Sequence, residues 1–286
     1  VTLPHAGEVS GMAIPPGLTL IVGGGYHGKS TLLEAIAQGV YAHIPGDGRE
    51  LVATDPTATK VRAADGRAVT GVDISPFITH LPGGADTTSF STENASGSTS
   101  QAASIIESLE LGARTLLIDE DTSATNLLIR DTRMRDLVAA EKEPITPLVD
   151  RVSSLTESGV SLIMVVGGSG AFLDAADRVL MMDNYRCLDV TSRAREVVAD
   201  LPRPRTDEPT SWEAAPRVPG AKDRVDRPRT KASGTTILTI DRSTVDISDV
   251  AGVVDPGQAE AIAWCVRGVL EEMAGKQSMP ELMAKL

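Results

Sequence analysis

Three kinds of residue are scarce in this chain of 286 residues, and each scarcity excludes a class of protein. The two cysteines, Cys187 and Cys265, have neither metal-ligand spacing nor the number of a disulfide framework, so a reduced, cytoplasmic protein is expected. Aromatic residues make up 3%, which argues against a base-stacking surface for single-stranded nucleic acid. Basic residues are outnumbered, with a net charge of −12 and a pI of about 4.8, which excludes binding to DNA or anionic lipid by charge alone.

Long hydrophobic runs are missing as well. No apolar run approaches the ~20 residues that a membrane-spanning helix needs. No basic segment followed by an apolar segment marks a secretory signal. The sequence therefore predicts a protein without a membrane segment, with enough hydrophobic residues, at 41%, for a sizeable core.

The most informative segment lies between residues 18 and 41. Residues 18–22 are an apolar run typical of a buried parallel strand. The motif G-x-x-x-x-G-K-[ST] follows as Gly23-Gly24-Gly25-Tyr26-His27-Gly28-Lys29-Ser30. Residues 31–40 then carry apolar side chains at helical spacing. Strand, glycine-rich loop and helix together predict a P-loop that binds ATP with Mg²⁺.

Each part of this loop has an expected role. The glycines let backbone N–H groups surround phosphate oxygens, and the helix start adds the positive end of its dipole. Lys29 is expected to neutralise the β- and γ-phosphates, and Ser30 to place its hydroxyl on Mg²⁺. Thr31 is expected to contact the α-phosphate. His27 is expected to contribute mostly its backbone and no catalytic group.

A second segment, residues 115–120, reads as a buried strand that ends in two acids, a Walker B pattern. Asp119 is expected to hold the magnesium ion, directly or through a water. Glu120 is expected to lie beside the γ-phosphate and to orient or deprotonate the attacking water. Solvated acids at the end of an ordinary strand are the alternative.

Polar segments flank this strand on both sides. Upstream, Ser96-Gly97-Ser98 opens a predicted helix, which makes a second anion cradle. Downstream lies Ser123-Ala124-Thr125-Asn126. This order resembles the ABC ATPase superfamily, whose signature is a serine followed by two glycines and whose D-loop reads Ser-Ala-Leu-Asp. The resemblance implies that Ser96, Gly97 and Ser98 bind nucleotide across a dimer interface.

The amino-acid sequence of several stretches is similar to that of the soluble family described as predicted ATPases of the ABC class. These stretches are residues 73–77, 90–101, 119–126, 143–147 and the region 245–262. The resemblance implies an α/β P-loop NTPase fold of ABC ATPase type: a mostly parallel sheet flanked by helices, with a small C-terminal α+β appendage. An additional N-terminal region precedes the P-loop in that family. Because this chain begins with Val1, we expect it to be a truncated version.

Two departures from the superfamily concern hydrolysis. The strand expected at residues 161–166 ends in Gly167-Gly168-Ser169-Gly170, without the usual switch histidine. Ser169 is predicted to bond the γ-phosphate as a catalytic group, with N–H groups of the same turn. A simple strand-to-helix turn is the alternative. A Q-loop glutamine is also missing, and Asp73 or Ser75 is predicted in its place.

The predicted domain organisation has three parts. Residues 1–200 form the nucleotide-binding domain, 201–234 a Pro- and charge-rich linker, and 235–286 a small C-terminal segment packed on the main domain. Within the first part, residues 61–72 alternate around Asp65-Gly66, which predicts a β-hairpin. A basic stretch in the linker suggests either nucleic-acid binding or a solvated segment; it contains Lys222, Arg224, Arg227, Arg229 and Lys231.

One P-loop and one signature in a chain imply, by the resemblance, a head-to-tail homodimer with two composite ATP sites. Hydrolysis would then open the dimer and drive a soluble partner. An ATP-binding switch with little turnover, associated with nucleic acid, is the first alternative. A P-loop kinase is the second, and the signature and D-loop argue against it.

Overall fold

A six-stranded sheet forms the centre of the computed structural model, which describes residues 1–5, 7–200, 212, 216–220, 228–250, 252–272 and 275–285. Its strand order is β10-β9-β3-β8-β7-β4. Every neighbouring pair is parallel except β9 and β10, which form an antiparallel hairpin at one edge. The strands are β3 (Leu18–Val22), β4 (Ala58–Val61), β7 (Thr115–Asp119), β8 (Ser161–Val165), β9 (Arg178–Asp183) and β10 (Arg186–Asp189).

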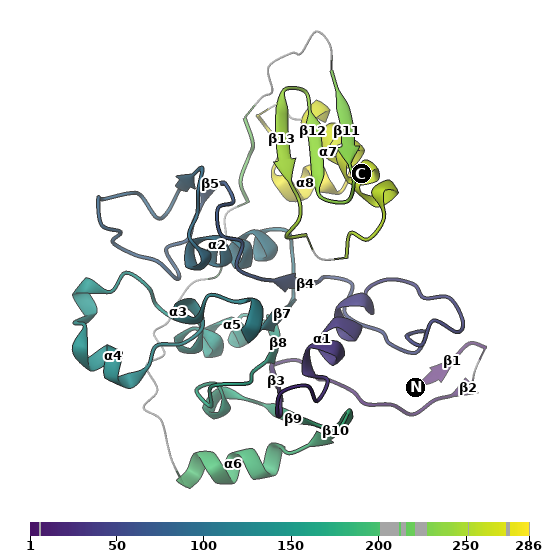
Figure 1. Cartoon of the computed structure of the whole chain (residues 1–286), viewed down its shortest axis with the longest axis vertical. Coiled ribbons are helices and arrows are strands. Elements are labelled where there is room, and N and C mark those ends of the chain that lie inside the picture. Colours follow the sequence, from purple (N-terminus) through teal and green to yellow (C-terminus); the bar gives the residue numbers. More distant parts are fainter. Residues whose placement is uncertain are drawn as a thin grey trace.

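Helices cover both faces of this sheet (Figure 1). Helix α1 (Lys29–Gln38) lies on one face; α2 (Gly97–Glu110), α3 (Thr125–Leu128) and α5 (Val152–Glu157) lie on the other. Helix α6 (Thr191–Asp200) packs beside β9, and α4 (Thr132–Leu137) lies away from the sheet. Short 3₁₀ turns are η1 (Glu120–Thr122), η2 (Ala140–Lys142), η3 (Leu148–Asp150) and η4 (Leu173–Ala175).

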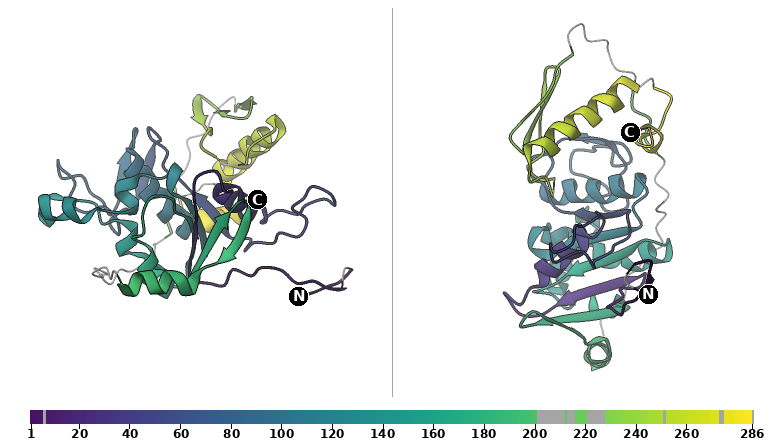
Figure 2. Two further views of the ribbon diagram at one scale, coloured as in Figure 1. Left: turned by 60° about the horizontal axis from the view of Figure 1, so that its bottom comes forward. Right: turned by 90° about the vertical axis from the view of Figure 1, so that its right-hand side faces the viewer.

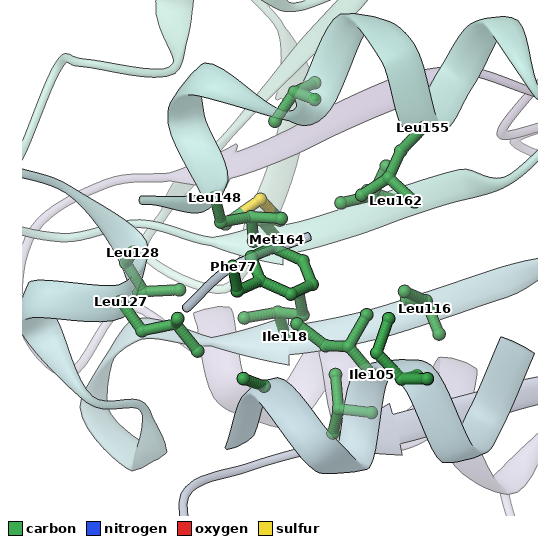
Figure 3. Packing of buried hydrophobic residues seen from close by; sticks show 14 of the residues in the cluster. Phe77, Ile105, Leu116, Ile118, Leu127, Leu128, Leu148, Leu155, Leu162 and Met164 are labelled. Atoms are coloured by element: carbon green, nitrogen blue, oxygen red, sulfur yellow. The ribbon is translucent and has the colours of Figure 1, made fainter. Parts of the chain in front are cut away.

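The central strands are apolar along their whole length because both of their faces are buried. In β7, Leu116 and Ile118 belong to a large cluster with side chains of α2 and α5, shown in Figure 3. Leu117 points the other way, into a smaller cluster with Leu33 and Ile36 of α1. Burial of one such side chain stabilises the fold by roughly 1.5–3 kcal/mol. The predicted mostly parallel sheet flanked by helices is confirmed.

The predicted hairpin at residues 61–72 is wrong. Strand β4 pairs in parallel with β7, while β5 (Val69–Val72) pairs antiparallel with β6 (Phe90–Thr92). Asp65-Gly66 does form a turn, but Gly66 N–H bonds Ala95 O at 2.8 Å and leads the chain toward α2. Val61 is buried beside the central strands, and this burial outweighs a local pairing that would have left it in a two-stranded ribbon.

The C-terminal subdomain consists of an antiparallel sheet covered by a long helix (top of Figure 1). Its elements are β11 (Thr230–Ser233), β12 (Ile237–Ile240), β13 (Ser243–Asp246), α7 (Pro256–Glu272) and α8 (Met279–Met283). The first strand starts at Thr230, so ordered structure begins before residue 235, where the sequence placed the boundary. Residues 201–211, 213–215 and 221–227 of the predicted linker lie outside the described residues.

Contacts among the described residues join this subdomain to the rest of the chain, among them an ion pair and a backbone hydrogen bond. Arg62, directly after β4, lies 3.4 Å from Asp249 in an ion pair. Met279 N–H at the start of α8 bonds Arg217 O at 3.0 Å. The Arg217 side chain in turn bonds Glu110 of α2 at 2.8 Å. The subdomain is thereby connected to the helix that begins at the predicted signature.

The N-terminal segment projects away from the sheet and ends in a small hairpin of β1 (Thr2–Leu3) and β2 (Gly7–Glu8), as Figure 2 shows. No helix within the described part of the chain combines the length and the hydrophobicity that a bilayer crossing requires. Cys187 and Cys265 are both free and exposed.

Candidate nucleotide-binding site

The P-loop connects β3 to α1 at the carboxyl edge of the sheet. Gly23 has φ 137°, and a Cβ placed on it would lie 2.4 Å from the Met182 carbonyl oxygen, so only glycine fits. Gly28 has φ 95° and caps α1. The Lys29 ammonium donates to the carbonyl oxygens of Gly23 at 2.9 Å and Gly24 at 2.8 Å. The lysine is thus folded back over the loop, where the sequence predicts phosphate binding.

The first turn of α1 and the end of β7 supply the predicted metal ligands. Ser30 and Thr31 are exposed on the first turn of α1. Asp119 is the last residue of β7 and is 5% exposed, and its carboxylate accepts the Asp121 N–H at 3.1 Å. A hydroxyl and a carboxylate are hard oxygen ligands of the type that Mg²⁺ prefers. The donor chemistry of Ser30 and Asp119 therefore fits this ion.

Glu120 is held by the turn that follows β8. Its carboxylate accepts two backbone N–H groups, from Gly167 at 2.6 Å and Gly168 at 2.9 Å. A Cβ placed on Gly167 would lie 3.8 Å from a Glu120 carboxylate oxygen and 3.8 Å from Lys29 Cε. The P-loop lysine and the Walker B glutamate therefore both lie close to the same glycine. Charge-assisted bonds of this kind fix the direction of the carboxylate.

The turn after β8 differs from its prediction in one respect. The sequence predicts that the N–H groups of this turn point at a γ-phosphate. In the structure, the N–H groups of Gly167 and Gly168 donate to the Glu120 carboxylate. The Ser169 hydroxyl accepts the N–H of Ala171 at 3.1 Å within the same turn. A role of Ser169 in catalysis stays a prediction.

The predicted signature turn begins α2. Ser96 is the N-cap, and its hydroxyl accepts the Thr99 N–H at 3.4 Å. Ser98, where the superfamily has a second glycine, donates its hydroxyl to Asn126 Oδ1 at 2.7 Å. Gly97 faces the loop after β4, because a Cβ on it would lie 3.5 Å from Asp65 Oδ1. Ser98 is buried, so its side chain serves the D-loop while Ser96 and Gly97 remain at the helix start.

Gln101 is a link that sequence reasoning missed. It is fully buried in α2. Its amide donates to Ser123 Oγ at 2.9 Å and accepts the Ala124 N–H at 2.8 Å. Ser123 Oγ also donates to the Asp119 carbonyl oxygen at 2.7 Å. One glutamine thus joins the signature helix, the D-loop and the end of the Walker B strand. The sequence signal that could have identified Gln101 is its polar side chain within an otherwise apolar stripe of the helix.

The position next to the signature turn is occupied by Asp65, and the sequence analysis did not single it out. Asp73 Oδ1 instead accepts the Ser75 N–H at 3.0 Å in an exposed turn after β5. The substitution of either residue for a Q-loop glutamine stays a prediction. Asp65 lies in the loop after β4, the strand that neighbours β7.

The predicted basic stretch falls mostly outside the described residues, which include only Arg229 and Lys231 of it. The Arg229 carbonyl accepts the Arg267 guanidinium at 2.8 Å within the C-terminal subdomain. A surface for nucleic acid is therefore not assigned from this stretch.

Comparison with known proteins assigns both parts of the chain. The model of the ABC_ATPase P-loop domain matches residues 1–217, and that of the MRB1590 C-terminal domain matches residues 229–286. The uncharacterized protein MJ1628 of Methanocaldococcus jannaschii is 30% identical over 195 residues, which are 67% of this chain and 43% of that protein. The chain thus spans less than half the length of this relative.

The chain also has a low similarity to solved structures, among them two proteins of ABC transporters. One is MJ1267 in its ADP conformation, a cassette of an ABC transporter, with a TM-score of 0.40 and 13% identity over 65% of this chain and 85% of that one. Another is cbiO1 of Clostridium perfringens, part of the ABC transporter complex cbiONQ, with a TM-score of 0.43 and 18% identity over 67% and 87%. Both likenesses are low, so family membership rests on the sequence match over residues 1–217.

Proposed function

The chain belongs to the ABC ATPase P-loop family, and from this premise we propose that it binds ATP with Mg²⁺ and hydrolyses the ATP to ADP and phosphate. The convergence of Lys29 and Glu120 on Gly167 carries the proposal. A cationic group that neutralises phosphate and a carboxylate that activates water are the two groups this reaction requires. The family match itself supports nucleotide binding and ATPase activity in general.

The residues of the site would divide the work between them. Backbone N–H groups of the P-loop and the Lys29 ammonium bind the phosphates. Ser30 and Asp119 would hold Mg²⁺, which when bound neutralises charge on the phosphates. Glu120 orients a water and accepts its proton, and the two glycine N–H groups hold its carboxylate in one direction. General-base action of this kind contributes roughly 10²–10⁴-fold.

A head-to-tail dimer would complete the site. In the sheet, β8 and β7 separate the P-loop strand β3 from β4, and the signature turn packs against the loop after β4. Ser96 and Gly97 are thus placed beyond the Walker B strand as seen from their own P-loop. We propose that they close over ATP held by a second copy, while the first copy's P-loop receives the partner's signature. Loss of the γ-phosphate would then open the dimer.

The same geometry supports an alternative, an ATP-binding switch with little turnover. The turn after β8 offers glycines where a histidine side chain would reach the γ-phosphate, and two of its N–H groups are already bonded to Glu120. In either case the opening and closing of a cytoplasmic dimer would act on a soluble partner system.

Steady-state MgATP hydrolysis by the parent and by Glu120→Gln, with particle mass from light scattering, tests the proposal. We expect hydrolysis to fall by about 10²–10³-fold in the variant. The variant should still bind ATP and should accumulate as a dimer. Glu157→Gln, on the exposed end of α5, is the matched control and should hydrolyse like the parent.

The outcomes separate the alternatives. ATP binding without turnover by the parent would favour the switch. Turnover that is unchanged in Glu120→Gln would remove this residue from the mechanism. An MgATP hydrolysis signal from Lys29→Ala equal to that of the parent would contradict the P-loop assignment as a whole.

A further inference from the structure

The turn of the β9–β10 hairpin is attached to the P-loop. Asn184 N–H in this turn donates to His27 Nδ1 at 2.9 Å. A Cβ placed on Gly28 would lie 3.0 Å from Cδ1 of Tyr185. The Tyr185 ring therefore stands against the residue that caps α1, and Gly28 must lack a side chain for this contact to exist. Figure 1 shows the hairpin beside β3, at the end of the strand where the P-loop begins.

The backbone of this region is strained. Four non-glycine residues of the described chain have positive φ, and three of them meet here: Tyr26 at 63°, Asn184 at 47° and Tyr185 at 64°. Asparagine tolerates the left-handed region, but a tyrosine there carries a steric cost that glycine would avoid. Such strain tends to be retained at functional sites. A turn that needed only its shape would be served better by glycine at position 185.

The side chain of the same tyrosine is exposed to solvent. Tyr185 is 75% exposed, although each of the chain's three phenylalanines is buried and the Trp212 ring packs on Phe77. Tyr41 and Trp264 are also exposed, but neither has a positive φ; Tyr26, within the P-loop, is fully exposed and has a φ of 63°. Among the exposed aromatic residues outside the P-loop, Tyr185 combines exposure, a positive φ and contact with the P-loop. An exposed ring of this kind offers a flat apolar face to a ligand.

The direction in which a bound nucleotide leaves the P-loop follows from the sheet order. Glu120 and Gly167 mark the hydrolysis end of the site, and they come from β7 and β8. The β9–β10 hairpin lies on the opposite side of β3. With the γ-phosphate toward β8, the nucleoside must emerge toward the hairpin, where Tyr185 stands at the start of α1.

We propose that Tyr185 is the nucleobase platform of this chain and that its ring stacks on the purine of the bound nucleotide. The inference rests on the proposed nucleotide binding and adds to it the residue that holds the base. Stacking on an aromatic ring tolerates different bases because each base has a π-face. The platform should therefore favour a nucleotide over a bare polyphosphate more strongly than it favours adenine over guanine.

Binding of MgATP and of magnesium tripolyphosphate, which lacks a base, tests this in the whole chain by calorimetry. Removal of the ring in Tyr185→Ala should raise the Kd for ATP by about 10–100-fold. Tyr185→Phe should stay within about twofold of the parent. Tripolyphosphate should bind equally to all three proteins, because its contacts to the P-loop do not involve the ring.

Two further variants guard against misfolding and indirect effects. Tyr185→Gly removes the ring and suits the left-handed backbone, so its melting temperature should not fall. Tyr41→Ala removes the third tyrosine, which is exposed after α1 with an ordinary backbone, and should bind ATP like the parent.

Two results would overturn the platform. ATP could bind Tyr185→Gly as tightly as the parent, or the affinity for tripolyphosphate could fall in parallel with that for ATP. The second result would mean that the ring only supports the shape of the P-loop. If the parent bound neither ATP nor tripolyphosphate, the proposed function would fail with it, whereas both results above leave that function standing.

Discussion

The carboxyl edge of the central sheet and the C-terminal subdomain both hold polar side chains in hydrogen bonds, but for different ends. At the sheet edge, Gln101 and Glu120 bond backbone groups of neighbouring loops and so set the position of those loops. In the C-terminal subdomain, the buried Arg267 pairs with Asp241 at 2.5 Å and with the Arg229 carbonyl at 2.8 Å. The first set arranges groups around a ligand site, and the second ties strands to a helix.

The size of the apolar core explains this difference. The sheet has a large cluster on one face and a smaller one on the other, so its polar groups need not hold the fold together. The buried core of the C-terminal subdomain is small and includes two alanines; it consists of Leu238, Ile240, Ile247, Ala259 and Ala263. All residues of β13 are exposed. A small unit with little apolar burial depends more on each internal bond.

The largest expected effect is at the sheet edge. Lys29→Ala removes the positive charge of the P-loop. ATP affinity should fall by more than ~10³-fold, because a charge-assisted contact to phosphate is lost. Thermal stability without nucleotide should stay near that of the parent. Lys60→Ala, which removes an ion pair with Glu34 at 2.8 Å, is the control and should keep its affinity. Isothermal calorimetry measures both.

The next effect would be on stability alone. Arg267→Met removes a buried guanidinium that pairs with the partly exposed Asp241, and the free energy of unfolding of the C-terminal subdomain should fall by about 3 kcal/mol. Hydrogen exchange resolved along the sequence measures this. ATP affinity should not change. Arg242→Met, in the exposed turn before β13, is the matched control and should have little effect. A loss of ATP affinity in Arg267→Met would show that the two regions are not independent.

A smaller effect is expected for Gln101→Leu. The variant removes both bonds to the D-loop, and kcat should fall by about tenfold while KM stays the same, because the D-loop loses its position relative to Asp119. Gln101→Glu keeps the acceptor for the Ala124 N–H and should lose less. Gln277→Leu, in the C-terminal subdomain, is the control. A tenfold rise in KM would mean that Gln101 acts in nucleotide binding and not in positioning the D-loop.

The smallest effect concerns a residue outside both regions. The Gln38 carbonyl raises the pKa of His43, and the Asp47 carboxylate adds to this shift. A raised pKa in the folded state means that the stabilising charge is fully present below the ordinary pKa of histidine. That contribution is lost as pH rises through the raised value. An NMR titration should show the raised pKa, and Asp47→Asn should lower it. An unchanged value in Asp47→Asn would remove the ion pair as a cause.

The sequence predicts those parts of the site that are continuous in the chain. The strand at residues 18–22, the glycine loop and the helix after it follow from local spacing alone, although the helix expected at residues 31–40 is Lys29–Gln38. Asp119 and Glu120 at the end of a buried strand follow from local spacing too. Such motifs need only neighbouring residues, whose backbone preferences are short-range. The alternation of Leu116, Leu117 and Ile118 between two clusters also follows once the strand is identified.

What depended on the tertiary structure was which distant segments meet. Glu120 finds its N–H donors in a turn 47 residues further along the chain, and Gln101 finds the D-loop 23 residues away. Strand order placed β4 beside β7, so that residues 61–72 separate instead of forming a hairpin. The β9–β10 turn met the P-loop in the same way. Such contacts depend on sheet order and register, which are set by burial summed over the whole core and leave no mark in any short stretch of sequence.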